Sequence, residues 1–169
     1  MVSRRARPLA RGPKVGNNPP VPPVFPIPEG LRVCPDGSWR VGDLPVVHPT
    51  GLRYLKERLR HEAAGDFVVE GQQRVPIAVA GPAFEVTRLE LDAAHDRASV
   101  LLDDGTAEPI GDDALGMSAD TGRFECRVRD GSFAALLGRG PHQTLLEHVE
   151  EDGGRFFLRV GSRRIPVRT

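Results

Sequence analysis

Two stretches of the chain repeat one arrangement of apolar and polar positions. Residues 65–77 read GDFVVEGQQRVPI, and residues 154–167 read GRFFLRVGSRRIPV. In each stretch an aromatic residue opens an alternating apolar run, a glycine follows, and an arginine, a β-branched residue and a proline close the pattern. This alternation around a glycine predicts a β-hairpin in both places, with one extra residue in the second turn.

Each predicted hairpin follows a segment with the spacing of an amphipathic helix. In residues 52–63, Leu52, Leu55 and Leu59 fall on one helical face, and residues 145–151 form the corresponding segment. Two copies of a helix and a hairpin favour a duplicated unit over one continuous sheet. We therefore expect an α+β protein with two similar small domains, which share an interface because each alone would bury a thin core.

The rest of the pattern predicts further short elements. Alternating apolar positions indicate strands near residues 31–41, 84–91 and 124–128, and the alternation shifts between Val86 and Leu89, as at a β-bulge. A helix capped by Asp130 is predicted through residue 137, and glycines and a proline separate it from a helical piece over residues 142–151. Trp39, the only tryptophan, is expected to be buried.

The first 28 residues are rich in arginine and proline and poor in apolar side chains, which predicts a disordered arm. For its last part, residues 24–27, the alternative is contact with the body of the protein. We divide the remainder into a first domain, residues 29–91, and a second, residues 92–169. The arm contains five basic residues and no acid, so the rest of this chain of zero net charge is acidic by the same amount. A mildly acidic body argues against nucleic-acid binding except through the arm.

Localisation follows from the absence of long apolar runs. No run approaches the roughly 20 apolar residues that a membrane span requires. The basic N-terminus is not followed by the apolar region of a secretory signal. We therefore expect a cytoplasmic protein that does not bind membranes.

Several short motifs together resemble a bacterial family catalogued as domain of unknown function 1285. They are DGSW at 36–39, LPV at 44–46, PAFEV at 82–86, VRDG at 128–131, Ala134, Arg139 and GGRF at 153–156. The chain differs from the family pattern at Asp103-Asp104 and at residues 151–154. The resemblance implies two related α+β domains, the second loosely like a pleckstrin-homology barrel. It also implies a cleft between them for a nucleotide-like ligand, and a role in signalling.

The reactive side chains form no recognised catalytic or metal-binding motif. Cys34 and Cys126 lack the spacing of a zinc site, and His142 and His148 are too far apart to share one helical face. Cys126 alternates with apolar neighbours, as a buried residue does. We expect no cofactor, no metal and no catalytic residue.

The arginines are the best candidates for ligand binding. Arg129 ends a predicted strand just before a predicted helix start that includes Ser132, where backbone N–H groups and the guanidinium favour an anion. Arg74, Arg139 and His48 are its expected neighbours across the domain boundary. For Arg74 and its equivalent in the repeat, Arg164, a structural ion pair is the alternative.

These observations favour a non-enzymatic ligand-binding or regulatory module. It would bind a small anionic, possibly nucleotide-like ligand, or a protein partner, between its two domains. Two alternatives stay open. An enzyme acting on a nucleotide-like substrate would need a clustered acid and base, and a protein–protein adaptor would need an exposed apolar patch.

Overall fold

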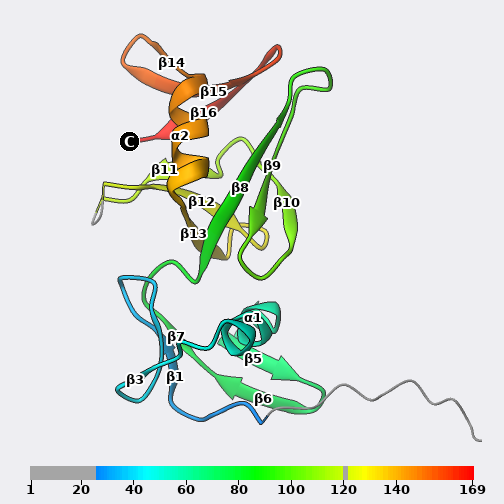
Figure 1. The fold of residues 1–169 in the computed structure, drawn as a ribbon, viewed down its shortest axis with the longest axis vertical. Helices are drawn as coiled ribbons and strands as arrows, with labels where there is room; N and C mark the ends of the chain where they lie inside the picture. The colour runs from blue at the N-terminus through cyan, green and yellow to red at the C-terminus, as the bar shows by residue number, and fades with distance from the viewer. Residues whose placement is uncertain (1–25, 120–121) are drawn as a thin grey trace, which may run out of the picture.

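The structure is a computed structural model that describes residues 26–119 and 122–169. The predicted arm falls outside the described residues up to residue 25. The described chain forms two halves, residues 26–79 and residues 84–169 (Figure 1). The first half contains β1 (Leu31–Val33), β2 (Trp39–Val41), β3 (Leu44–Pro45), α1 (Pro49–Glu57), β4 (Leu59–Glu62), β5 (Gly65–Glu70), β6 (Gln73–Pro76) and β7 (Ala78–Val79).

The second half contains nine strands and one helix among the described residues. They are β8 (Phe84–Asp92), β9 (Arg97–Leu102), β10 (Ala107–Pro109), β11 (Leu115–Met117), β12 (Phe124–Val128), β13 (Phe133–Leu137), α2 (Arg139–His148), β14 (Val149–Asp152), β15 (Arg155–Val160) and β16 (Arg163–Arg168). The protein is therefore mostly β, with two helices and several sheets.

The first half is built from two small sheets and α1. Their strand orders are β3-β2-β1-β7 and β4-β5-β6. Trp39 is buried, as predicted, and its Nε1 donates a 3.0 Å hydrogen bond to the carbonyl oxygen of Ala83, just before β8. Ile27, in the last part of the predicted arm, is also buried in the core, which agrees with the alternative of contact with the body. The packed part of the chain therefore starts before residue 29.

The first helix is shorter than its sequence predicts. It ends at Glu57, and the segment from Leu59 to Glu62 is strand β4 instead of the last turn of a helix. Leu59 pairs with Val68 of β5 and is buried there. The spacing of Leu52, Leu55 and Leu59 fits a helix equally well, so pairing with β5 decides the conformation.

The second half is one nine-stranded sheet of order β10-β9-β8-β13-β12-β11-β16-β15-β14. The helix α2 packs against β8 and β15 and buries Leu145 (Figure 1). The register shift between Val86 and Arg88 confirms the predicted bulge. The sheet is curled, since strands near its two edges come into contact. Arg163 of β16 donates a 3.1 Å hydrogen bond to the carbonyl oxygen of Ile110, just after β10.

The prediction of a helix from Asp130 to residue 137 is wrong. Residues 133–137 are strand β13, which lies between β8 and β12 inside the sheet. Arg129, Asp130 and Gly131 have positive φ angles of 55°, 54° and 81°, and they turn the chain between β12 and β13. A short apolar run such as Phe133–Leu137 suits a strand that is buried on both faces.

The second helix is also displaced from its prediction. It begins at Arg139, with Gly138 as its N-cap, so the glycine-rich segment starts the helix instead of interrupting it. It ends at His148, and the next four residues form β14, which pairs with β15.

A unit of one helix followed by three antiparallel strands occurs once in each half. The strand registers match: Leu59 pairs with Val68 as Val149 pairs with Leu158. Likewise, Phe67 pairs with Pro76 as Phe157 pairs with Pro166. The turns between the last two strands, Gly71-Gln72 and Gly161-Ser162, have equal length. The expected extra residue in the second turn is therefore not present.

The two halves share a core and meet between β7 and β8. The buried apolar side chains of both halves form one continuous cluster. The boundary predicted after residue 91 falls within β8, which belongs to the nine-stranded sheet, so the sheets change at residues 80–83 instead. In the part of the chain that the structure describes, no helix combines the length and apolar character needed to cross a membrane.

Candidate functional site

Arg129 lies at the centre of a charged cluster in the second half. Its guanidinium pairs with the carboxylate of Asp104, whose side chain is fully buried, and lies 3.3 Å from Oε1 of Glu108. Its backbone N–H donates a 2.8 Å hydrogen bond to Oε2 of Glu108, and Nη2 donates to the hydroxyl of Thr106 at 3.1 Å. Two carboxylates thus surround one guanidinium, which leaves Arg129 no free charge for a ligand.

The other four predicted residues are spread over the molecule. Ser132 lies in the same turn as Arg129, and Arg139 is exposed at the start of α2. Arg74 pairs with Glu62, and its guanidinium stacks 3.8 Å above the ring of Phe67. Of the five, only Arg129 and Ser132 are brought together by the fold.

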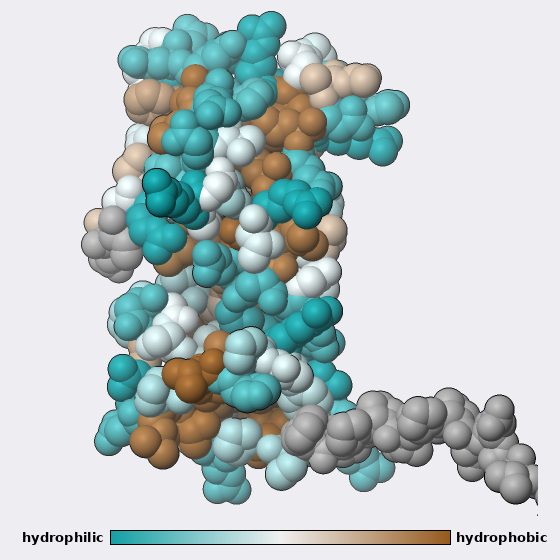
Figure 2. All heavy atoms as spheres, in the orientation of Figure 1, coloured by the Kyte–Doolittle hydropathy of each residue, from teal (hydrophilic) through white to brown (hydrophobic). Residues whose placement is uncertain are grey.

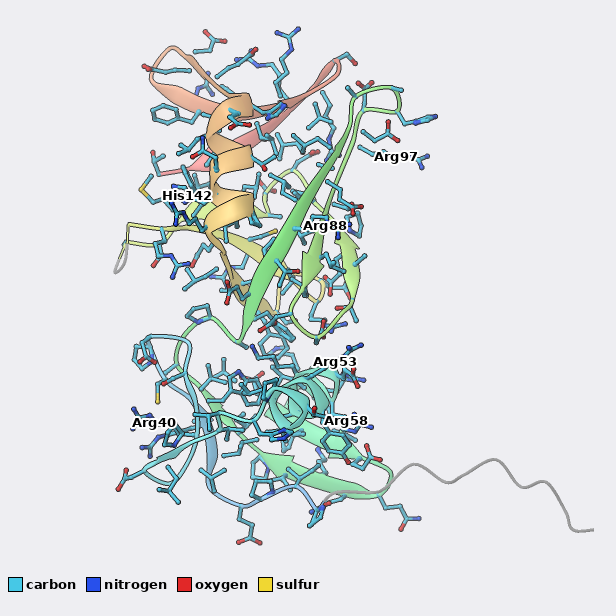
Figure 3. The ribbon with its side chains drawn as sticks, in the orientation of Figure 1. Arg40, Arg53, Arg58, Arg88, Arg97 and His142 are labelled. Carbon is cyan, nitrogen blue, oxygen red and sulfur yellow. The ribbon has the colours of Figure 1, made fainter. Side chains whose placement is uncertain are left out.

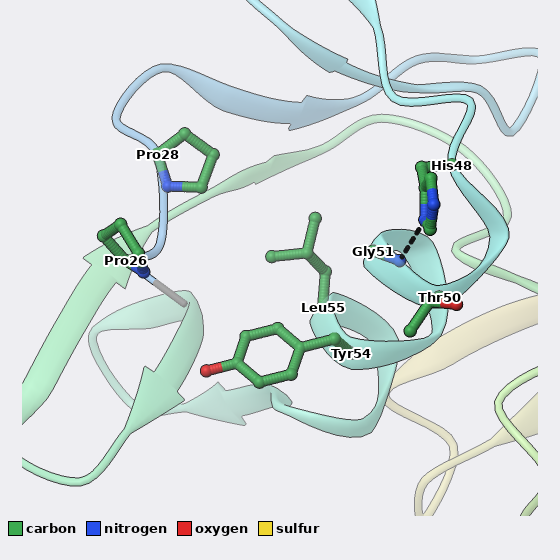
Figure 4. Close-up of a pocket in the computed structure, with 7 residues that line it drawn as sticks. All are labelled: Pro26, Pro28, His48, Thr50, Gly51, Tyr54 and Leu55. Carbon is green, nitrogen blue, oxygen red and sulfur yellow. Dashed lines mark hydrogen bonds between the residues drawn. The ribbon is translucent and has the colours of Figure 1, made fainter. Parts of the chain in front are cut away.

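His48, the last of the five predicted site residues, has a structural role in the first half. His48 is the N-cap of α1, and its Nδ1 accepts a 3.4 Å hydrogen bond from the N–H of Gly51. The same side chain lines an apolar pocket beside the helix start (Figure 4).

The junction between the halves is held by a buried ion pair. The ammonium group of Lys56, on α1, pairs with the carboxylate of Asp103, in the turn after β9. Arg53 of the same helix approaches this turn, since a Cβ on Gly105 would lie 2.8 Å from its Nη2 (Figure 3). The other oxygen of Asp103 accepts a 3.1 Å hydrogen bond from the N–H of Glu85.

The pocket at this junction is small and rich in acids. Its volume is about 140 Å³, and its charged lining residues are Asp36, Lys56, Glu85, Asp103 and Arg123. Lys56 is already paired, and Nη2 of Arg123 donates a 2.9 Å hydrogen bond to the carbonyl oxygen of Leu137. An anion here would lie beside three carboxylates, and the ammonium group of Lys56 already has one of them as its partner.

A larger groove, with a volume of about 850 Å³, runs over the outer side of the second half. Its floor crosses β12, β11 and β16, because β11 lies between the other two strands. Arg127 on β12 and Arg168 on β16 both line it and are exposed. Neither forms an ion pair or side-chain hydrogen bond with any described residue. These two arginines are the least neutralised cations that share one groove.

The local sequence explains why both arginines face the groove. On β12, Phe124, Cys126 and Val128 are buried, so Arg127 between them points outward. On β16, Ile165 and Val167 are buried, and Arg168 next to them points outward as well. Gly116 pairs with Arg168 across β11 and β16, and a Cβ there would lie 3.6 Å from Cβ of Arg168.

Acidic residues also line the groove, and they fall into two classes. Glu108 contacts Arg129, and Asp112 forms a 2.6 Å ion pair with Arg163. Asp113 and Asp130 are exposed and form no ion pair within the described residues. The groove therefore offers two unpaired guanidinium groups and two unpaired carboxylates.

Of the two free cysteines, Cys126 is buried in the second half. Burial raises the pKa of the Cys126 thiol to about 12, with help from the nearby carboxylates of Glu108 and Glu125, so this thiol stays protonated at neutral pH. Within residues 26–119 and 122–169, no three His, Cys, Asp or Glu side chains are grouped so that they could hold a metal ion.

Comparison with solved structures relates this architecture to known proteins. A DUF1285 family protein from Silicibacter pomeroyi DSS-3 superposes with a TM-score of 0.65 at 20% identity, over 82% of this chain and 79% of that one. A second one, from Shewanella baltica OS155, gives 0.54 at 13% identity, over 70% of this chain and 91% of that one. The chain has the fold of the DUF1285 proteins.

The resemblance drawn from the short motifs is thus confirmed at the level of the fold. No family model matches the chain, and no curated protein matches it in sequence. Neither DUF1285 neighbour is named for a ligand, a reaction or a partner.

Sequence reasoning missed the two arginines of the groove in this DUF1285 fold. The alternation around Cys126 and Val167 does indicate that Arg127 and Arg168 point away from the core. What the sequence does not give is the parallel pairing of β11 with β16, which brings β12 and β16 onto one surface. That pairing joins segments about 50 residues apart and follows from packing of the whole sheet.

Proposed function

We propose that this protein is a ligand-binding or regulatory module that takes a small anionic, nucleotide-like ligand in the outer groove of the second half. The observation that carries the proposal is the pair Arg127 and Arg168, which line one groove and have no carboxylate partner among the described residues. Guanidinium groups bind phosphate oxygens through paired hydrogen bonds, and two of them on one surface suit a phosphate group.

The carboxylates of the groove indicate which kind of anion it can bind. A bare phosphate would be repelled by Asp113 and Asp130, which are exposed beside the arginines. A nucleotide carries a phosphate at one end and hydroxyl and N–H donors at the other, and carboxylates commonly accept hydrogen bonds from a ribose. The groove volume, about 850 Å³, lies within the range of small-molecule sites.

The proposal places the ligand in this groove instead of the junction between the halves. At the junction the pocket is about 140 Å³, and Lys56 is neutralised by Asp103. An anion that binds there would have to displace the carboxylate of Asp103 from the buried ammonium group of Lys56. The outer groove requires no such displacement, because its two arginines are already exposed.

Thermal-shift measurements with purified full-length protein test this function. A panel of inorganic phosphate and nucleoside mono-, di- and triphosphates is compared at constant ionic strength. We expect at least one nucleotide to raise the melting temperature, since a ligand that binds only the folded state stabilises it by mass action. The double variant Arg127→Gln/Arg168→Gln should lose that shift.

The matched control is Arg155→Gln. Arg155 is also an exposed strand arginine with no ion pair in the described part of the chain, but it lies outside the groove. It should keep the shift. Equal shifts in the wild type and the double variant, or no shift with any nucleotide, would contradict the proposal. Both variants should keep the ligand-free melting temperature within a few degrees, because none of the substituted side chains is buried.

We also propose that the two helix-and-three-strand units are duplicates. Support comes from their shared registers and from one shared contact. Arg74 pairs with Glu62 and stacks on Phe67, and Arg164 pairs with Asp152 and stacks on Phe157. Arg74→Ala and Arg164→Ala should then cost similar free energies of unfolding, each about 0–1 kcal/mol because both pairs are exposed. Clearly unequal costs would argue against equivalent units.

A further inference from the structure

The first half has an apolar pocket at the start of α1 that no other described segment fills. Its volume is about 380 Å³. Two prolines form one side and the helix start forms the other, as Figure 4 shows; the lining residues are Pro26, Pro28, His48, Thr50, Gly51, Tyr54 and Leu55. Val47, just before His48, is 76% exposed. Figure 2 shows that part of the apolar surface of this face lies over the first half. The pocket is therefore a candidate place for an apolar side chain to bind.

The chain itself is anchored at the wall of this pocket. Ile27 is buried, and the side-chain amide of Gln73 holds its backbone from both sides. The N–H of Ile27 donates to Oε1 of Gln73, and Nε2 of Gln73 donates to the carbonyl oxygen of Ile27, each at 3.4 Å. Because Pro26 and Pro28 flank this anchor and line the pocket, the residues before Pro26 start at its edge.

The sequence before Pro26 has the chemistry that such a pocket binds. Residues 19–25 read PPVPPVF, a run of prolines that ends in two apolar side chains. Proline-rich segments dock into aromatic-lined grooves because their extended conformation costs little entropy to fix. Tyr54 supplies the aromatic wall, and Arg58 lies 3.6 Å from its ring centroid.

Reach and tethering also favour this occupant over a separate molecule. Five residues in a polyproline conformation span about 15 Å. A segment joined directly to the pocket wall has an effective concentration on the order of millimolar, so weak contacts suffice. We propose that residues 21–25 of the same chain occupy this pocket, with the side chains of Val24 and Phe25 against Tyr54 and Leu55.

Tyr54 reports on this contact because it is the only tyrosine of the chain. Full-length protein is nitrated with tetranitromethane, and the rate at Tyr54 is followed by mass spectrometry. The variant Val24→Ser/Phe25→Ser should be nitrated several-fold faster than the wild type, since it would leave the pocket open. The control Val15→Ser changes the same arm away from the proposed contact and should react like the wild type.

Two further readouts distinguish this contact from partial unfolding and from self-association. Near-ultraviolet circular dichroism of the buried Trp39 should be the same in all three proteins, which shows that the fold is kept. The wild-type rate should not change on hundredfold dilution. Equal rates in the wild type and the double variant would overturn the proposal. The proposal would also be overturned if Val15→Ser accelerated nitration of Tyr54 as much as the double variant does. Faster nitration of the wild type on dilution would overturn it as well, because a second copy of the chain would then be the occupant of the pocket.

Discussion

Arg129 and Arg164 both form ion pairs, but their surroundings give these pairs different energetic consequences. Arg129 faces Asp104, whose carboxylate is fully buried and also accepts hydrogen bonds from the N–H and hydroxyl of Thr106 at 2.9 and 2.6 Å. Arg164 faces Asp152, and both side chains are more than one-third exposed. Removal of one partner is costly only where it leaves a buried charge without compensation.

Arg129→Ala should therefore lower the free energy of unfolding by about 3–5 kcal/mol, because it strands the carboxylate of Asp104 inside the protein. Urea denaturation measures this, and Arg164→Ala is the control, with an expected cost of about 0–1 kcal/mol. If the two variants were equally stable, Arg129 would not be structural, and its sequence-based assignment to a ligand would regain support.

Asp96 gives the protein a predictable response to acid. Hydrogen bonds from the hydroxyl and N–H of Ser162, at 2.7 and 2.6 Å, hold the pKa of its carboxyl below the ordinary value of 3.8. A pKa that is lower in the folded state adds stability above the unfolded pKa. That stability is lost as the pH falls through the folded pKa.

The variant Ser162→Ala removes the hydroxyl donor and should be less stable than the wild type near neutral pH. The difference between their melting temperatures should narrow as the pH is lowered from about 6 to about 2, because the protonated carboxyl no longer favours the folded state. A difference that stays constant or widens in acid would show that Asp96 does not act through its charge.

At the scale of elements, the turn between β15 and β16 contacts the turn between β8 and β9 (Figure 1). Gly161 has a φ of 59°, and a Cβ there would lie 2.4 Å from the carbonyl oxygen of Ala93. Gly161→Ala should therefore cost about 1–3 kcal/mol, through both strain and displacement of backbone. Its equivalent, Gly71, has a similar φ of 58°, but no atom of the described residues lies within 4 Å of a Cβ there, so Gly71→Ala should cost less. Thermal unfolding compares the two, and equal costs would count against the contact.

Periodicity predicted strands more reliably than helices in this chain. The alternation of Phe124, Cys126 and Val128, the bulge after Val86 and the burial of Trp39 are all confirmed. The helix predicted at 130–137 failed because its apolar run is short, and only the neighbouring strands β8 and β12 determine its conformation. The two similar stretches of sequence are recognisable from their hairpins. Strands β4 and β14 are not predicted, because apolar and polar residues alternate too weakly in them.

The candidate site was harder to predict, for a related reason. Arg129 was chosen because a helix start was expected after it, and the structure has a tight turn there instead. Arg127 was not chosen because its partner in the groove, Arg168, lies on a distant strand. Local pattern gives the direction of a side chain, whereas the partners of that side chain depend on the order of strands in the sheet.

At the scale of the whole molecule, Lys56 and Asp103 connect the halves. Lys56 is buried and Asp103 is partly exposed. Lys56→Met should therefore destabilise the protein, because Asp103 loses its cation, and the double variant Lys56→Met/Asp103→Asn should recover part of that loss. Urea denaturation of the single and double variants measures this. Additive losses would show that the two side chains do not interact.

The central claim is that a nucleotide-like ligand binds in the groove of Arg127 and Arg168. Titration of ¹⁵N-labelled full-length protein with the best nucleotide of the thermal-shift panel tests it most directly. We predict that backbone amide shifts concentrate around Gly116, Arg127, Gly131 and Arg168, and that Lys56 and Glu85 at the junction stay unchanged. Shifts confined to the junction, or none at saturating nucleotide, would contradict the account.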